Sequence, residues 1–325
     1  MLQDSHARIH NYLRISLTDA CNFRCLYCMP EDPSFMPSAR LMTGNEIEQI
    51  ATEFVKLGVT KIRLTGGEPL VRKDAAQIIH RLSKLPVELT LTSNGILVNE
   101  YMQTLLASGI RSLNISIDSL NPARFAAITR RDVWQQVWDN IELLLAHQFH
   151  VKLNVVVMRG VNDDEINDFV ALTKDLPLHV RFIEFMPFEG NQWQSNRVIT
   201  QTEILEAIQV QYSSYKLHDE LHDTAKKFQV FGFAGTYAII STMSQPFCGG
   251  CNRLRLTADG KMKNCLFSQG EADLLTALRS GQDIVPIIKQ NVKEKAKETG
   301  GQLLADFTQV DASSLYNRSM VKIGG

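Results

Sequence analysis

Six cysteines, arranged as two sets of three, are the residues of this sequence best suited to metal chemistry. The first set is Cys21, Cys25 and Cys28, and the second is Cys248, Cys251 and Cys265. Cysteine thiolates ligate zinc and iron–sulfur clusters. Because a structural zinc site generally has four protein ligands, three per set indicates centres that keep one position open.

The spacing of the first set is C-x3-C-x2-C, within eight residues. Zinc sites more often use C-x2-C or C-x4-C pairs completed by Cys or His. His6 and His10 precede this segment, but nothing in the sequence marks either as a ligand. The clustering favours an iron–sulfur cube, with zinc as the alternative. The second set, spaced C-x2-C-x13-C, is compatible with zinc or with an iron–sulfur cluster.

Composition excludes several classes of protein. Of 325 residues, 44% are hydrophobic and 21% are charged, and the formal net charge is −1. These values argue against a disordered chain and against a basic nucleic-acid-binding protein. No apolar run approaches the ~20 residues that span a bilayer, and residues 1–12 lack the apolar centre of a signal peptide. We therefore expect a cytoplasmic protein without a membrane or nucleic-acid partner.

A strand-then-helix pattern repeats six times in the first ~185 residues. The expected strands are 12–18, 61–65, 87–92, 111–117, 150–158 and 179–185. This pattern predicts an α/β fold with a parallel sheet, either an open sheet or an incomplete (β/α)6 TIM-type barrel. For the helices, residues 43–46 form a capping box. Further expected starts are Asp74, Asn99 and Asp132, and expected ends are Gly58 and Gly109.

The expected strands alternate between apolar and polar residues. Strands buried on both faces would be apolar almost throughout. Here one face carries Leu and Ile, while the other carries Arg14, Arg63, Thr92, Lys152 and similar residues. The alternation indicates a barrel whose lumen is polar and cationic and suits an anionic ligand. The sixth strand fits less well, because Ile183 follows Arg181 on the polar face. An antiparallel edge sheet with one wet face is the alternative.

Four of the strands are followed directly by polar or glycine-rich segments. These are TGGEP (65–69), TSNG (92–95), SID (116–118) and EFMP (184–187). In βα architectures the carboxyl ends of the strands form the active face. We expect these four segments to lie together at the mouth of the barrel.

The βα rhythm stops near residue 190. We expect residues 1–190 to form the partial barrel with the first cysteine set. Residues 191–325 should form a smaller α+β portion that covers the barrel mouth and carries the second set. It should contain a helix at 200–208, short antiparallel strands, a hairpin turn at Asp259-Gly260 and helices within 271–297.

The cysteine motif, the GGEP segment and several longer stretches together resemble the GTP 3′,8-cyclase family of the radical S-adenosylmethionine (SAM) superfamily. The stretches are RISLTDACNFRCLYCMP, TKIRLTGGEPLVR, LTSNG, NVVVMRGVNDDE, VRFIEFMP, CNRLRLTADGK and the final Gly-Gly. The resemblance spans residues ~8–325. It implies a lyase of molybdenum cofactor biosynthesis with two [4Fe–4S] clusters, each held by three cysteines and each with one open iron.

The resemblance also implies roles for individual residues. The open iron at Cys21, Cys25 and Cys28 would bind SAM, and the one at Cys248, Cys251 and Cys265 would bind GTP. The implied SAM contacts are Tyr27, Gly67, Ser116 and Met186. The implied GTP contacts are Arg14, Arg63, Thr92, Lys152, Arg253 and Arg255, with Lys61 and Arg181 as further candidates. Gly324 and Gly325 would enter the active site.

The implied reaction is a radical cyclisation. A 5′-deoxyadenosyl radical would take H3′ from GTP, and C3′ would attack guanine C8 to give (8S)-3′,8-cyclo-7,8-dihydroguanosine 5′-triphosphate. The implied partners are an electron donor such as flavodoxin or ferredoxin, and cyclic pyranopterin monophosphate synthase, which receives the product. The sequence is compatible with a monomer or a homodimer.

One position departs from the family pattern. Ala20 stands where the family usually has Arg, which removes a cation beside the first cysteine set but no cluster ligand. Two other functions remain open at this point: another radical SAM enzyme with an auxiliary cluster, for instance a peptide-modifying one, and a non-catalytic iron–sulfur sensor.

Overall fold

Six parallel strands form the centre of the molecule. The computed structural model describes residues 1–30, 32–303 and 306–325. The strands are β1 (Tyr12–Ser16), β2 (Lys61–Thr65), β3 (Glu88–Ser93), β4 (Ser112–Ser116), β5 (His150–Val157) and β6 (His179–Glu184). They pair in chain order and in parallel, so that Arg14 lies opposite Arg63, for example. The expected incomplete barrel is confirmed.

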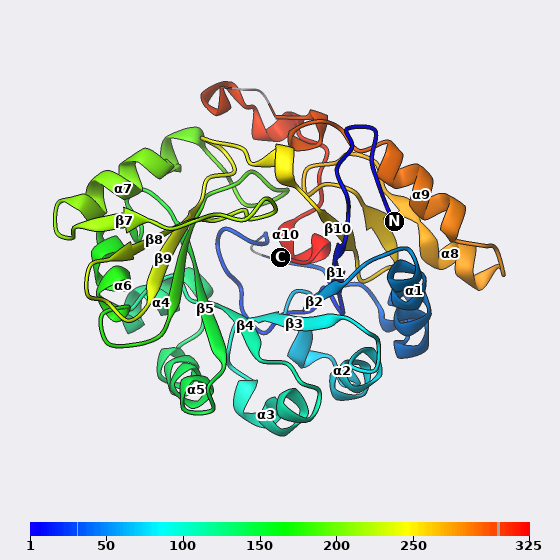
Figure 1. Cartoon of the computed structure of the whole chain (residues 1–325), viewed down its shortest axis with the longest axis horizontal. Coiled ribbons are helices and arrows are strands. Elements are labelled where there is room, and N and C mark those ends of the chain that lie inside the picture. The colour runs from blue at the N-terminus through cyan, green and yellow to red at the C-terminus, as the bar shows by residue number, and fades with distance from the viewer. Residues whose placement is uncertain (31, 304–305) are drawn as a thin grey trace.

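Helices cover the outside of these strands. They are α1 (Gly44–Lys56), α2 (Ala75–Leu82), α3 (Val98–Ala107), α4 (Pro122–Thr129), α5 (Trp134–Ala146) and α6 (Ile166–Leu172). In Figure 1 they form an arc around the curved sheet, and the inside of the arc is left to loops and to the end of the chain. Each crossover therefore brings the next strand back parallel to the last.

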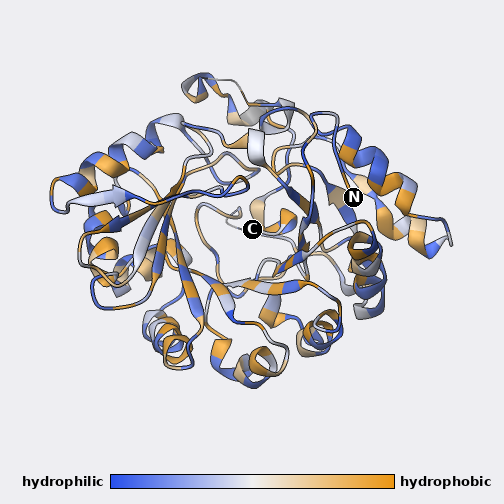
Figure 2. Ribbon diagram, viewed as in Figure 1, coloured by the Kyte–Doolittle hydropathy of each residue, from blue (hydrophilic) through white to orange (hydrophobic). Residues whose placement is uncertain are grey.

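The apolar and polar residues that alternate along the strands lie on opposite faces of the sheet, as predicted. Leu13, Ile15, Ile62, Leu64 and Leu153 belong to the set that points outward and is fully buried in the main core. In Figure 2 the helices likewise turn apolar stripes toward the sheet. β6 follows the same rule, because Val180 and Phe182 are buried and Arg181 takes the other face. The polar residues are thereby left for the lumen.

The later strands extend the same sheet at both edges. The strands are β7 (Ser214–Lys216), β8 (Lys226–Val230), β9 (Thr236–Ile240), β10 (Arg253–Leu256), β11 (Lys261–Lys263) and β12 (Ala272–Asp273). β9 pairs with β6 and β10 pairs with β1, both in parallel, within one twelve-stranded sheet. The expected antiparallel pairing holds between β8 and β9 and between β10 and β11. The parallel pairing of β9 and β10 with the barrel was not predicted, since a short alternating pattern carries no information about which edge a strand joins.

The remaining helices and turns follow the predictions closely. α7 (Gln201–Gln209) begins at a capping box made by Thr200 and Glu203. α8 (Leu274–Arg279) and α9 (Val285–Lys293) lie within 271–297, and Gly260 makes the hairpin turn with a φ of +70°. The predicted helix starts at Asn99 and Asp132 are wrong by one or two residues. α3 and α5 are preceded by Leu97 and Val133, neither of which caps with its side chain.

The end of the chain lies inside the ring of strands. The short helix α10 (Met320–Ile323) and the last residue sit at the centre of Figure 1, surrounded by β1 to β6. Val321 and Ile323 are buried there. None of the helices in the described residues is long and apolar enough to cross a membrane.

Candidate active site

A cavity at the carboxyl ends of the strands brings the first cysteine set together with the expected SAM residues. Cys21, Cys25 and Cys28 line it. Its walls also include Tyr27, Gly67, Ser116 and Met186, together with Thr92 and Gly325. Residues from the loops after β1, β2, β3, β4 and β6 thus meet at one place, as their positions after successive strands predict.

The two glycines of GGEP allow the backbone after β2 to approach the cysteine loop. A Cβ on Gly66 would lie 2.6 Å from the Thr18 oxygen, and one on Gly67 would lie 2.5 Å from the Ala20 oxygen. The Gly67 N–H donates to Thr18 O at 2.7 Å, and the Glu68 N–H donates to Ala20 O at 2.9 Å. These N–H groups join the cysteine loop to the GGEP segment.

Two carboxyl groups at this cavity were not assigned roles from the sequence. Glu68 is fully buried and accepts from the Asn94 N–H at 2.7 Å and the Ser93 hydroxyl at 2.9 Å. Asp118 accepts from the Val156 N–H at 2.9 Å. Burial raises the pKa of Glu68 to about 7 and that of Asp118 to about 6. The only sequence signal was that both follow a strand directly, in GGEP and SID.

The thiols of the first set lie in a buried, anionic environment. Burial, followed by the charge of Glu68, raises the pKa of Cys21 to about 11. Burial and the charge of Asp118 raise the pKa of Cys25 well above its usual range. The pKa of Cys28 is raised by burial and by Cys21. A bound metal centre would hold these sulfurs as thiolates at neutral pH.

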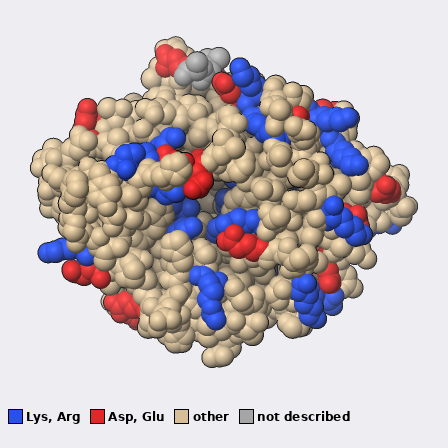
Figure 3. Space-filling model, in the orientation of Figure 1, with Lys and Arg blue, Asp and Glu red and all other residues tan. Residues whose placement is uncertain are grey.

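A group of cations lines the lumen. The inner face carries Arg14, Arg63, Lys152, Arg181 and Arg255. Burial, followed by the charge of Arg255, lowers the pKa of Arg14 well below its usual range. Burial, followed by Arg181 and Arg63, lowers the pKa of Lys152 to about 8. Burial and Arg63 lower the pKa of Arg181 to about 9, and burial and Arg253 lower that of Arg255 to about 10. Figure 3 shows Lys and Arg side chains gathered around a central hollow. The predicted cationic lumen is thus present.

Two of these guanidinium groups have buried N–H groups that lack acceptors. In the described part of the chain, the Nε atoms of Arg14 and Arg181 are buried without a hydrogen-bond partner. An unsatisfied buried donor costs about 1–3 kcal/mol, and more when it is charged. Such a site favours an anionic ligand with many acceptor oxygens, which a triphosphate provides.

Two other expected GTP residues lie at the ends of this cation group. The Lys61 ammonium is already paired with Glu88 at 2.8 Å, and its side chain is 31% exposed. Arg253 stacks 5.2 Å from the centre of the Phe247 ring, beside the second cysteine set. The roles of all these residues toward GTP stay predictions, but Lys61 is the one whose charge already has a carboxylate partner.

The second cysteine set lies among basic groups. Burial raises the pKa of Cys251, but Arg253 and Lys295 outweigh it and lower the pKa to about 6. The Lys295 ammonium lies 3.4 Å from Cys251 Sγ, and the Thr299 N–H lies 3.3 Å from Cys248 Sγ. N–H groups of this kind stabilise cluster thiolates and tune their reduction potential.

An N-terminal arginine fixes the loop that carries Cys248. The Arg8 guanidinium donates to the oxygens of Cys248 (2.9 Å), Lys297 (2.7 Å) and Ala296 (2.8 Å), and to the Asp4 carboxylate (2.6 Å). The sequence analysis missed Arg8 because its partners lie about 240 residues away. No local pattern in the sequence indicates such a contact.

The thiols of the first set share one cavity. Cys21, Cys25 and Cys28 all line it, and among the described residues no group of three His, Cys, Asp or Glu side chains is placed to hold a single metal ion. Three thiols around one cavity suit a four-iron cube, which is larger than one ion and is ligated at its separate corners.

The final Gly-Gly reaches the inner face of the barrel. Arg255 Nη1 donates to Gly324 O at 2.6 Å. Gly324 has a φ of +87°, and a Cβ there would lie 2.7 Å from Thr65 Oγ1 and 2.8 Å from Ser16 Cβ. Gly325 lines the cavity of the first cysteine set. No other residue fits at Gly324 without displacing β1 or β2.

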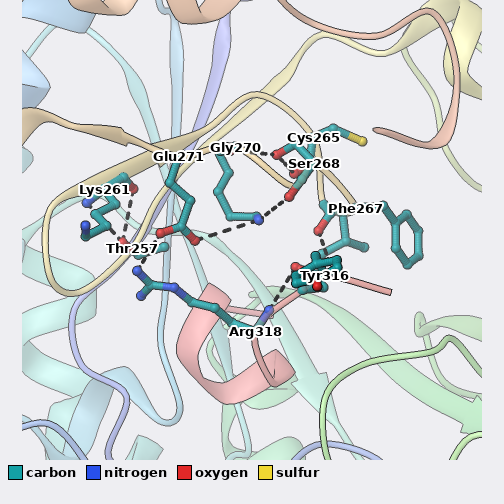
Figure 4. A network of polar contacts seen from close by, with 12 residues as sticks. Thr257, Lys261, Cys265, Phe267, Ser268, Gly270, Glu271, Tyr316 and Arg318 are labelled. Carbon is teal, nitrogen blue, oxygen red and sulfur yellow. Dashed lines mark hydrogen bonds and ion pairs between the residues drawn. The ribbon is translucent and has the colours of Figure 1, made fainter. Parts of the chain in front are cut away.

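A polar network connects the end of the chain to the hairpin of the second cysteine set. Arg318 donates to the Asp259 carboxylate at 2.9 Å and to Glu271 at 2.5 Å. Lys263, which is 1% exposed, donates to Ser268 O at 2.5 Å and lies 3.8 Å from Glu271 (Figure 4). The Ser268 hydroxyl donates to Cys265 O at 3.0 Å. The tail and the third cysteine are thus held by one set of contacts.

Comparison with known proteins agrees with this site. Residues 15–173 match the Radical SAM superfamily model, and residues 178–300 match the Molybdenum Cofactor Synthesis C model. The barrel and its cysteine site are those of a radical SAM protein.

The chain is 45% identical to the Arabidopsis thaliana "GTP 3′,8-cyclase, mitochondrial", covering 100% of this chain and 84% of that one. It is 41% identical to the Peptoclostridium acidaminophilum "GTP 3′,8-cyclase", covering 98% of that chain. The chain belongs to the GTP 3′,8-cyclase family.

Some relatives are longer than this chain. It is 44% identical to the human "Molybdenum cofactor biosynthesis protein 1" and spans 51% of that protein. Among solved structures, Streptococcus suis SuiB is similar over 91% of this chain and 68% of its own, with a TM-score of 0.61 and 12% identity. SuiB bound to S-adenosylmethionine gives a TM-score of 0.57 at 14% identity. These two similarities show the shared fold.

Proposed function

We propose that this chain is a radical SAM lyase that converts GTP into (8S)-3′,8-cyclo-7,8-dihydroguanosine 5′-triphosphate, the first step of molybdenum cofactor biosynthesis. The observation that carries the proposal is the pair of buried, partnerless guanidinium donors of Arg14 and Arg181 in a cationic lumen. The membership of the GTP 3′,8-cyclase family supports the same reaction.

Cys21, Cys25 and Cys28 would hold a [4Fe–4S] cluster that, when reduced and bound to SAM, would supply the 5′-deoxyadenosyl radical that takes the hydrogen from C3′ of GTP. Tyr27, Gly67, Ser116 and Met186 line the cavity in which SAM would be held. Thr92 lines the same cavity and is also an expected GTP contact. This sharing supports a site in which the two substrates lie close together, as hydrogen transfer requires.

The lumen would fix GTP at both ends. Arg14, Arg63, Lys152 and Arg181 would bind the triphosphate, and Arg255 is electrostatically coupled to Cys251 and Cys265 of the second set. A second cluster at Cys248, Cys251 and Cys265 would hold the guanine through its open iron. Val321 and Ile323 are buried, and the Gly-Gly end lies on the inner face, so the tail helps to exclude water from the radical.

The reaction consumes two electrons per turnover, one for SAM cleavage and one for the final reduction. We propose that flavodoxin or ferredoxin supplies them, and that the product passes to cyclic pyranopterin monophosphate synthase. GTP loses one hydrogen atom to the radical and regains one as an electron and a proton, so the product has the mass of GTP.

The test is an anaerobic incubation of reconstituted protein with SAM and dithionite, with and without GTP deuterated at C3′. The expected result is deuterated 5′-deoxyadenosine and a GTP isomer that chromatography separates from GTP. Unlabelled 5′-deoxyadenosine with GTP unchanged would leave a radical SAM enzyme with another substrate. No 5′-deoxyadenosine from protein that holds both clusters would instead indicate a sensor.

A peptide-modifying radical SAM enzyme is the second candidate. The structure of SuiB bound to its precursor peptide has the same fold, with a TM-score of 0.60 and 12% identity. Such an enzyme has no need for Arg14, Arg63, Lys152 and Arg181 on one inner face. The cationic lumen therefore favours the nucleotide.

A further inference from the structure

Tyr12 is a tyrosine inside the lumen to which the mechanism above gives no role. It begins β1, two residues before Arg14, so both side chains lie on the inner face. Its neighbours in register are Lys61 on β2 and Arg253 on β10. The aromatic ring thus lies among the cations expected to bind the triphosphate.

The hydroxyl of Tyr12 makes a direct contact with one of these cations. Arg63 Nε donates to the Tyr12 oxygen at 2.5 Å, and Arg63 Nη1 donates to Leu91 O at 3.0 Å. Arg63 is 4% exposed. These two bonds fix the plane of the guanidinium. Among the described residues, its third nitrogen, Nη2, has no hydrogen-bond acceptor.

The charges around Tyr12 are almost all positive. The groups that face it are Arg14 on its own strand, Lys61 and Arg63 on β2, Lys152 on β5, Arg181 on β6, and Arg253 and Arg255 on β10. The nearest carboxylate, Glu88, is bound to Lys61. Burial raises the pKa of Tyr12, but Arg63 and Arg14 outweigh it and lower the pKa to about 8.

A hydroxyl differs from the surrounding cations in the bonds it can make. Lys and Arg only donate, whereas a tyrosine oxygen accepts one bond while its O–H donates another. Tyr12 can therefore bridge Arg63 and an anion.

We propose that Tyr12 is a further triphosphate-binding residue, which accepts from Arg63 and donates its O–H to a phosphate oxygen of GTP. The inference rests on the proposed function. It has a second consequence. Because the phosphate requires the protonated phenol, GTP binding near pH 8 takes up a proton from solvent.

The test compares Tyr12→Phe with the unaltered protein in calorimetric titrations with GTP and with guanosine. Loss of a hydrogen bond to a charged group should weaken GTP binding about tenfold to a hundredfold. Guanosine carries no phosphate, so its affinity should stay unchanged. Titrations at pH 8 in buffers of different ionisation enthalpy should show proton uptake that is smaller in Tyr12→Phe, where only Lys152, with its pKa of about 8, still takes up a proton when the triphosphate binds. In turnover assays KM for GTP should rise by a similar factor while kcat changes less than about twofold.

Tyr237→Phe is the matched control, since it removes a buried tyrosine hydroxyl that contacts Ser214 outside the lumen. It should leave GTP binding unchanged. Equal GTP affinities in Tyr12→Phe and the unaltered protein would overturn the inference, and so would an equal loss of guanosine affinity. If the unaltered protein itself does not bind GTP, the proposed function fails instead.

Discussion

The two cysteine sets have the same number of ligands, but the charged groups beside them differ. The first lies beside the carboxyls of Glu68 and Asp118, which contribute to the raised pKa values of Cys21 and Cys25. In the second, Arg253 and Lys295 lower the pKa of Cys251 to about 6, while burial raises the pKa of Cys248. The surrounding charge alters the reduction potential of a cluster, so the two centres are tuned differently.

The two sets are also held in place differently. The first is a short loop between β1 and α1, fixed by the backbone of the GGEP segment. The second depends on contacts from distant parts of the chain, with Arg8 on one side and the Arg318 network on the other. A local motif therefore builds the first centre, whereas the complete fold builds the second.

Replacing one ligand in each set tests this division of roles most directly. Cys25→Ser should abolish 5′-deoxyadenosine formation altogether. Cys251→Ser should keep SAM cleavage with dithionite but lose conversion of GTP. Each variant should lose about half of the bound iron. The assay is chromatographic quantification of both products beside iron analysis. If Cys251→Ser abolished SAM cleavage while its first cluster was intact, the two centres would not have separate roles.

Removing Arg8 should affect only the second centre. Arg8→Ala removes the charged partner of the buried Asp4 carboxylate and the guanidinium donor to three carbonyl oxygens, which should lower the free energy of unfolding by about 3 kcal/mol. Iron at the second set should be lost while SAM cleavage persists. Denaturant unfolding and iron analysis measure the two effects. Retention of all iron would contradict the role of Arg8 as an anchor.

Mild acid should act on the same N-terminal anchor. Burial and the Lys295 charge lower the pKa of His10 to about 4 from its usual 6.5, and its Nε2 lies 3.0 Å from the Asp4 carboxylate. Between these two pH values the unfolded chain binds more protons than the folded chain. The contribution of neutral His10 to the free energy of unfolding is therefore complete above pH 6.5. It is lost as the pH drops toward 4, which lowers the free energy of unfolding by up to about 3 kcal/mol.

Unfolding curves at several pH values measure this effect, and His10→Gln should flatten the dependence in that range. An unchanged slope in His10→Gln would assign the pH dependence to other groups.

The Arg318 network should give the smallest effect. Arg318→Ala should speed hydrogen exchange in residues 316–325 and lower kcat several-fold, because the Gly-Gly end loses its anchor, while stability falls by about 1 kcal/mol. Arg279→Ala is the control, since Arg279 forms a comparable pair with Glu46 on the surface. It should change neither exchange nor kcat. Unchanged exchange at the tail in Arg318→Ala would contradict the anchor.

The sequence predicted what is set by local patterns. Alternation predicted the two faces of β1 to β5, and the position of motifs after strands predicted that the segments of Gly67 and Ser116 lie together. Only the family resemblance indicated Tyr27, which lines the same cavity. Arg14, Arg63 and Lys152 were placed on the inner face by their parity with apolar neighbours. These features depend on residues a few positions apart, so a single sequence reports them.

What the sequence did not predict depends on pairing between distant segments. Nothing near residue 253 indicates that β10 joins β1 in parallel, and nothing near Arg8 indicates its contact with Cys248. The hydrogen bond from the Gly67 N–H to Thr18 O was not predicted, because the acceptor belongs to another strand end. The boundary proposed at residue 190 stays a prediction, but the sheet continues across it.

The pairing of β10 with β1 has a consequence for how the chain is made. During synthesis, the edge of β1 at Tyr12 stays unpaired until the ribosome has made its partner strand at Arg253. At about 5–20 residues per second the delay is roughly ten to fifty seconds. An unpaired strand edge exposed for that time invites pairing with other chains. Growth temperature, translation speed and chaperone supply should therefore govern how much of this protein reaches its native state.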